Sequence, residues 1–123
     1  MSGPGGGPIR LTVLVKRNPA LSAEEFHAQW RAHGRMIADE PVFARYIRRY
    51  EQHHRVPADY GSPLYAGEEF DGMAVQSFDS FKDFMAMLQT PEYAAKMQPD
   101  EDRILDLPKM VVLITAEAEV FLP

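Results

Sequence analysis

"IRLTVLVKRNPALSAEEFHAQW", residues 9–30, joins the pattern of a β-strand to that of a helix start. Apolar and polar residues alternate along residues 9–17, as they do in a strand with one buried face. The apolar face consists of Ile9, Leu11, Val13 and Val15. Ser22 and Glu25 then have the spacing of a capping box, which predicts that a helix begins directly after Ser22.

The residues after Ser22 predict which side of this helix is buried. Large side chains recur at spacings of four, three and four residues, which places them in one stripe along a helix. The stripe consists of Phe26, Trp30, His33 and Ile37. Gly34 is expected to end the regular part of the helix early, because glycine weakens a helix interior.

Five further segments have strand or helix patterns. They are a strand over 42–56, a strand over 70–78, a helix over 79–90, a short helix over 91–98 and a last strand over 109–121. The expected buried residues of the helix over 79–90 are Phe81, Phe84, Met85 and Leu88. The resulting order, β-α-β-β-α-β, predicts an α+β fold of the ferredoxin-like kind, with a four-stranded antiparallel sheet and its helices on one face.

The last expected strand is apolar on both of its faces. One face holds Met110, Val112, Ile114 and Ala116, and the other holds Val111 and Leu113. Two helices can cover only one side of a four-stranded sheet, and a large apolar face is rarely left in water. We therefore expect the second face to pack against the same face of another copy, which gives a homodimer with two-fold symmetry.

The composition narrows the class of protein. A chain of 123 residues fits one domain, expected over 9–123, after a Gly/Pro-rich lead-in over 1–8 that is expected to be disordered. The lead-in has no apolar core and predicts neither a signal peptide nor a membrane anchor, so a cytoplasmic location is expected. The net charge of −5 argues against nucleic-acid binding. The chain has no cysteine, which excludes disulfides and thiolate chemistry.

Four short motifs in this order resemble the EthD family of the dimeric α+β barrel superfamily. They are W-x-x-H at 30–33, R-Y-x-x-x-H at 49–54, F-D-G at 70–72 and T-P-E at 90–92. The resemblance covers roughly residues 9–120. The family usually has two adjacent histidines where this chain has His33 and Gly34. In the second strand, His54 takes the place of the family histidine, and His53 replaces an asparagine.

The resemblance implies a cofactor-free protein that handles small, mostly apolar molecules. Relatives include enzymes of aromatic and polyketide tailoring, lactone isomerisation and ether degradation. We therefore expect a lyase, cyclase or isomerase that uses histidine proton transfer on a small aromatic, polyketide-like or lactone substrate. The alternatives are a cofactor-free monooxygenase of electron-rich aromatics, a non-catalytic protein that binds haem or another small molecule, and a purely structural dimer.

The second strand supplies the candidate site. Its period of two places one set of polar side chains on one face, which we expect to be the helix-free face and to line the pocket. These side chains are Tyr46, Arg48, Tyr50, Gln52 and His54. His54 would act as general base or acid, Tyr50 would donate a hydrogen bond to an oxyanion, and Arg48 would hold a carboxylate or enolate. The alternative is a paired, solvated position at the dimer rim.

Four more residues complete the candidate set. His33 would be a second proton carrier if it follows the resemblance, although a histidine on a buried stripe also serves as ordinary core. Asp71 is expected to bond its own backbone in a turn, and the alternative is that it orients a histidine. Trp30 and Tyr65 are candidates for substrate contact, with Tyr65, Glu68 and Glu69 in a long loop that could close over the pocket.

A metal site is not expected from the histidine spacing. His53 and His54 are neighbours on a strand and point to opposite faces. His27 and His33 lie about 120° apart around a helix. A single histidine could still bind haem, so the haem-binding alternative stays open.

Overall fold

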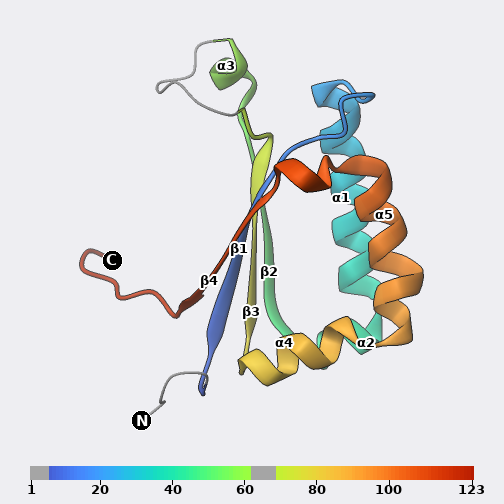
Figure 1. Ribbon diagram of the computed structural model, residues 1–123. Helices are drawn as coiled ribbons and strands as arrows, with labels where there is room; N and C mark the ends of the chain where they lie inside the picture. Colours follow the sequence, from blue (N-terminus) through green and yellow to red (C-terminus); the bar gives the residue numbers. More distant parts are fainter. Residues whose placement is uncertain (1–5, 62–68) are drawn as a thin grey trace.

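A computed structural model describes residues 6–61 and 69–123 and has the expected order of main elements (Figure 1). The strands are β1 (Ile9–Val15), β2 (Ile47–His54), β3 (Gly72–Phe78) and β4 (Val111–Ala116). The helical elements are α1 (Ala23–Asp39), α2 (Pro41–Ala44), α3 (Pro57–Tyr60), α4 (Phe81–Leu88), the π-helical η1 (Tyr93–Met97), α5 (Gln98–Ile104) and the 3-10 turn η2 (Leu107–Lys109). Most of the expected lead-in, together with Tyr65 and Glu68, lies outside the described residues.

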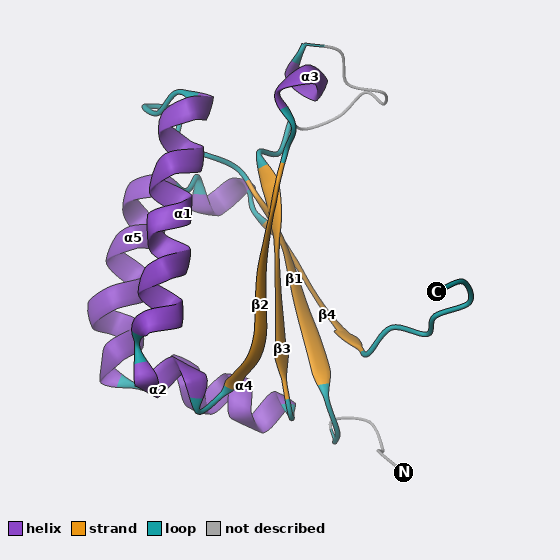
Figure 2. Ribbon diagram, turned by 180° about the vertical axis from the view of Figure 1, so that it is seen from behind, coloured by secondary structure: helices purple, strands orange, loops and turns teal. Residues whose placement is uncertain are grey.

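The four strands form one antiparallel sheet in the order β2-β3-β1-β4. Figure 2 shows the sheet close to edge-on, with α1, α2, α4 and α5 on one side of it. This arrangement confirms the predicted ferredoxin-like α+β fold with its helices on one face. Within the described residues, no helix combines the length and apolar character needed to cross a membrane.

The hydrophobic core lies between the sheet and α1. The apolar face of β1 and the predicted stripe of α1 are buried, which confirms both patterns. Ser22 caps α1 through the predicted reciprocal bonds with Glu25. Gly34 does not end the helix, because the apolar stripe continues to Ile37 and holds the last turns against the core.

Two features of the second half differ from the expectation: the buried side of α4 and the end of the short helix. In α4, Phe81 and Met85 are 40% and 41% exposed and Met87 is buried, so the expected buried side was partly wrong. The short helix expected to end at Gln98 continues as α5, although Pro99 follows directly. A π-helical turn, η1, precedes this proline, and its wider turn accommodates the missing backbone donor.

The start of β2 was also predicted wrongly. Residues 41–44 form the helical turn α2, and β2 begins only at Ile47. Its pairing with β3 shifts between Ile47 and Arg49, so Arg48 is the extra residue of a β-bulge. The period of two therefore does not run unbroken from Tyr46 to His54.

The face of the sheet opposite the helices is largely apolar at its centre. The register of β1 with β3 and β4 places Leu14 beside Met73 and Val111, and Thr12 beside Val75 and Leu113. Val111 is 49% exposed and Leu113 is 61% exposed. Within the described residues, none of the helices covers this face (Figure 2).

Candidate functional site

A pocket of about 680 Å³ lies between the first half of α1, the end of β2 and helix α3. Figure 1 shows the start of α1 and helix α3 at the same end of the sheet. The pocket is lined by Ala23, Glu24, His27, Arg31, His54, Arg55, Val56, Pro57 and Tyr60. This volume is within the usual range for small-molecule sites, and the lining combines apolar walls with a few polar groups.

Two histidines meet in this pocket. Nδ1 of His27, from α1, lies 2.6 Å from Nδ1 of His54, at the end of β2. The Trp30 ring contacts the His54 ring, with the ring centroids 4.6 Å apart and the ring planes tilted by 50°, and Trp30 itself is buried in the core. His27 follows the buried Phe26 along α1, and the two rings meet edge-on with their centroids 5.2 Å apart. The pair therefore joins the helix layer to the sheet.

The second ring nitrogen of His54 is held by Gln52. His54 Nε2 lies 3.0 Å from Gln52 Oε1, and Gln52 Nε2 donates to the Trp30 carbonyl oxygen at 2.7 Å. Gly34 leaves room for this amide, because a Cβ at position 34 would lie 2.7 Å from Gln52 Nε2. Gly34 stands where the EthD-like pattern has a second histidine. Because glycine has no side chain, the space beside it is occupied by Gln52.

The second ring nitrogen of His27 is held by Tyr60. His27 Nε2 lies 2.8 Å from the Tyr60 hydroxyl, which donates to Asp71 Oδ1 at 2.6 Å. Asp71 is 3% exposed and also accepts hydrogen bonds from the backbone N–H and the guanidinium of Arg17. The polar groups thus form one hydrogen-bonded chain from Asp71 through Tyr60 and the two histidines to Gln52.

The environment disfavours charge on the histidines. Burial, and after it the positive charge of Arg31, lowers the pKa of His54 to about 4. Burial also lowers the pKa of His27, although the Asp71 carboxylate opposes this shift. The pKa of Tyr60 is raised by burial and by its bond to Asp71, so its hydroxyl keeps its proton. At neutral pH this environment therefore favours uncharged histidine rings.

The predicted face of β2 was wrong. Tyr50, Gln52 and His54 share a face, as predicted, but this face packs against α1 and not on the helix-free side. The physical reason is that Trp30 and Gly34 of α1 give these side chains space and hydrogen-bond partners. The pocket consequently lies inside one copy of the chain, and not between two sheets.

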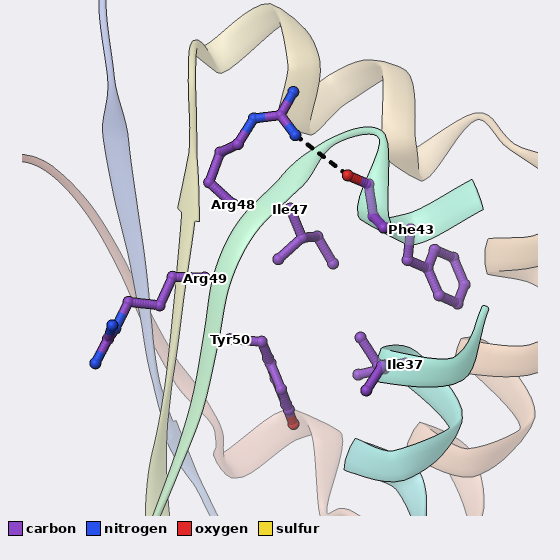
Figure 3. A pocket seen from close by; sticks show the side chains of 8 residues that line it. Ile37, Phe43, Ile47, Arg48, Arg49 and Tyr50 are labelled. Atoms are coloured by element: carbon purple, nitrogen blue, oxygen red, sulfur yellow. Dashed lines mark hydrogen bonds between the residues drawn. The ribbon is translucent and has the colours of Figure 1, made fainter. Parts of the chain in front are cut away.

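Arg48 and Tyr46 do not lie at this pocket. The Arg48 guanidinium donates hydrogen bonds to Asp79 at 3.0 Å and to two backbone carbonyl oxygens. It borders a second pocket of about 240 Å³ (Figure 3), where the side chains of Ile47 and Tyr50 turn toward Ile37. Tyr46 precedes the bulge and packs against the core.

His33 lies away from both pockets. It is 8% exposed, and its Nδ1 lies 2.8 Å from Asp100 Oδ2 of α5. Neither pocket includes His33 in its lining. The geometry favours a structural link between α1 and α5 over the predicted proton-carrier role.

Asp71, Trp30 and Tyr50 take supporting positions. Asp71 does not bond its own backbone in a turn, because its carboxylate binds Arg17 and Tyr60. It therefore reaches His27 only through Tyr60, which corresponds to the alternative of orienting a histidine. Trp30 contacts His54 from the core, and the Tyr50 hydroxyl accepts a hydrogen bond from Gln52 at 3.0 Å.

Two residues at the centre of the site were missed from the sequence. His27 lies one position beyond the predicted stripe and was considered only as a metal ligand. Tyr60 is in the loop after β2, which forms the short helix α3. One signal was available: a histidine beside a buried stripe lies at the edge of a helix, where it can contact the neighbouring sheet. Among the described residues, no group of three or more His, Cys, Asp or Glu could hold a metal ion.

Fold and site together define a ferredoxin-like α+β protein with a small-molecule-sized pocket between its helices and its sheet. A family model of the EthD domain matches residues 18–108, and the chain belongs to this family. No curated protein matches the sequence.

Solved structures with the same fold come from several organisms. A dimeric ferredoxin-like protein of unknown function from Bacteroides fragilis is 17% identical, with a TM-score of 0.65, 90% of this chain covered and 97% of that chain. A DABB family protein from Mesorhizobium loti is 14% identical, with a TM-score of 0.63 and coverages of 92% and 99%. Hydroxynitrile lyase from Passiflora edulis is 18% identical, with a TM-score of 0.61 and coverages of 94% and 97%.

Proposed function

We propose that this chain is a cofactor-independent lyase, cyclase or isomerase that moves protons on a small aromatic, polyketide-like or lactone substrate. The observation that carries the proposal is the 2.6 Å contact between His27 Nδ1 and His54 Nδ1 at the wall of a pocket of about 680 Å³. Membership of the EthD family and the likeness to a hydroxynitrile lyase fit an enzyme of this size and fold.

The two histidine rings have different roles in the proposed acid–base catalysis. Their outer nitrogens stay on Tyr60 and Gln52, so both rings keep their orientation when the contact between their Nδ1 atoms opens after a substrate has bound beside the pair. One Nδ1 atom then takes a proton from the carbon beside a carbonyl group. The other Nδ1 atom, which carries one additional proton taken up by the pair, donates a hydrogen bond to the carbonyl oxygen, where negative charge develops. Proton return to carbon or to a leaving group completes an isomerisation or an elimination.

The same contacts argue against haem ligation by His54. Both of its ring nitrogens already have partners in the protein, His27 and Gln52. Iron binding would break one of these contacts, beside the Trp30 ring that packs against the histidine. Proton transfer needs only the bond between the two histidines to open.

The protein is proposed to act as a homodimer. The helix-free face of the sheet carries exposed apolar side chains, and the related Bacteroides fragilis protein is dimeric. Packing this face against a second copy would remove it from water and leave the pocket on the opposite side of each sheet. Each copy would then hold a complete site.

The proposal is tested by hydrogen exchange at carbon. The purified protein is incubated in D₂O with a panel of small ketones, lactones and aromatic β-dicarbonyl compounds, and deuterium incorporation is followed by NMR. We expect catalysed exchange for at least one compound, and a loss of about 100- to 10,000-fold in rate for His54→Gln and His27→Gln.

His53→Gln is the matched control. This histidine precedes His54 but lies on the other face of β2, where it contacts Glu51. The control should keep the wild-type rate, provided that its oligomeric state is unchanged. Exchange that survives unchanged in both His54→Gln and His27→Gln would contradict the proposed function.

A further inference from the structure

Hydrogen atoms can be counted along the chain from Asp71 to Gln52, because both of its ends are acceptors. At one end, Gln52 Nε2 donates to the Trp30 carbonyl oxygen, so Oε1 must be the atom that faces His54. At the other end, the Asp71 carboxylate accepts from Tyr60. Each contact between these two ends needs one hydrogen atom.

The count leaves the chain one hydrogen short. Asp71–Tyr60, Tyr60–His27, His27–His54 and His54–Gln52 make four contacts. Tyr60 and two neutral histidines supply only three hydrogens. With both outer contacts made, the two Nδ1 atoms would face each other at 2.6 Å as bare lone pairs. One additional proton, shared by the two histidines, satisfies all four contacts.

The environment of the two histidines disfavours this additional proton. Burial is the first cause of the lowered pKa of both histidines, and the positive charge of Arg31 contributes to each shift. An anion placed beside the pair would reverse this balance, since it favours the charged form of a neighbouring base. Binding of an anion and uptake of a proton would then support each other.

The pocket has the groups that an aromatic anion needs. Arg31 lines it and forms no ion pair with any of the described residues, whereas Arg55 is paired with Asp59 at 2.8 Å. Ala23, Val56 and Pro57 give apolar contact for a ring. The charged or titratable groups around the histidine pair are Glu24 and Arg31 of α1, Arg55 at the end of β2, Asp59 and Tyr60 of α3, and the Arg17–Asp71 pair.

We propose that this pocket binds an aromatic carboxylate and that the His27–His54 pair takes up one proton as the carboxylate binds. The inference rests on the proposed function only in placing the substrate in the same pocket. It extends that function by naming the substrate class, an aromatic acid, and by stating which groups hold the acid's charge: Arg31 and the protonated histidine pair.

Isothermal titration calorimetry with benzoate tests the proposal on the full-length protein. Titrations at one pH in buffers with different ionisation enthalpies give the number of protons taken up per benzoate bound. We expect about one proton, and a dissociation constant that rises about tenfold per pH unit above neutrality. Benzamide, which has the same ring and no charge, should bind more weakly and without proton uptake.

Four variants separate the contributions of the histidine pair, Arg31 and Asp71. His54→Gln should abolish proton uptake, and His53→Gln should retain it. Arg31→Gln should weaken benzoate binding several-fold while proton uptake persists, because the histidine pair is intact. Asp71→Asn should remove the uptake for a different reason: the asparagine amide donates to Tyr60, so that neutral histidines then satisfy all four contacts.

The outcomes are distinct. Absence of benzoate binding, binding without proton uptake, equal binding of benzamide, or uptake that persists in His54→Gln would each overturn the proposal. Benzoate binding with proton uptake in a protein that catalyses no hydrogen exchange would keep this inference and remove the proposed enzymatic function. Hydrogen exchange without benzoate binding would keep the proposed enzymatic function and remove this inference.

Discussion

His27 and His54 contact each other through their Nδ1 atoms at 2.6 Å, across the boundary between helix α1 and strand β2. The Nε2 atom of each ring has a partner of its own, Tyr60 for His27 and Gln52 for His54. The contact places the candidate chemistry between the helices and the sheet of a single copy. The helix-free face of the sheet is then available for association with a second copy.

Gly34→Ala should disturb the site more than the fold. A Cβ at position 34 would lie 2.7 Å from Gln52 Nε2, the end of a flexible side chain that can move away. Moving Gln52 removes the partner of His54 Nε2. We expect a loss of unfolding free energy below about 1.5 kcal/mol, measured by urea denaturation. Proton uptake with benzoate should fall in the same variant, and an unchanged uptake would show that Gln52 does not fix His54.

Gly72→Ala is the contrasting variant. A Cβ at position 72 would lie 2.5 Å from the His53 carbonyl oxygen and 2.6 Å from Trp30 Cζ3. Backbone and a buried ring cannot move as freely as an amide end, so this change should cost roughly 1–3 kcal/mol or more in unfolding free energy. A smaller cost than that of Gly34→Ala would contradict the packing described for Trp30.

His33→Gln should reduce stability and leave the pocket intact. The substitution replaces the buried contact with Asp100 that links α1 to α5. We expect a loss of about 1–3 kcal/mol in unfolding free energy, since a buried polar partner is left poorly satisfied. Benzoate affinity and hydrogen exchange should be those of the wild type. A selective loss of exchange in a stably folded His33→Gln protein would restore the proton-carrier role predicted from the sequence.

Acid should destabilise the protein partly through His54. The folded-state pKa of His54 is about 4, below the ordinary 6.5, so the unfolded chain binds the proton first. This contribution to stability is complete above pH 6.5 and is lost as the pH falls toward 4. Between pH 7 and pH 5 it amounts to about 1 kcal/mol after allowance for solvent screening. Urea denaturation of His54→Gln should show a pH dependence smaller by that amount, and an equal dependence would contradict the lowered pKa.

Leu113→Asp should prevent dimer formation. Leu113 is 61% exposed on the helix-free face, where a carboxylate in a face-to-face interface would lose its water. Sedimentation equilibrium should give a dimer for the wild type and a monomer for this variant. Gln98→Asp, an exposed change in the first turn of α5, is the control with the same charge difference and should remain dimeric. A monomeric wild-type protein would remove the dimer proposal.

The fold could be predicted from the sequence because its signals are local. The alternation from Ile9 to Val15 and the stripe from Phe26 to Ile37 each report one buried face, and the order of such elements leaves few topologies. The bulge at Arg48 and the π-helical turn before Pro99 were not predictable in this way. Both depend on contacts with other parts of the fold, which a periodic pattern does not contain.

The site was only partly predictable. The pattern grouped Tyr50, Gln52 and His54 on one face, but alternation does not tell which face meets the helices. That choice depends on Trp30 and Gly34 of α1, which are distant in sequence. His27 was overlooked because it lies beside the buried stripe and not on it.

The central claim is that the two histidines share one proton when an aromatic carboxylate is bound. Nitrogen NMR of the protein labelled with ¹⁵N-histidine, at neutral pH and saturating benzoate, observes the ring nitrogens of His27 and His54 directly. The account predicts protonated Nε2 atoms on both rings and one further proton shared by the two Nδ1 atoms. Spectra in which both rings stay neutral with benzoate bound would contradict it.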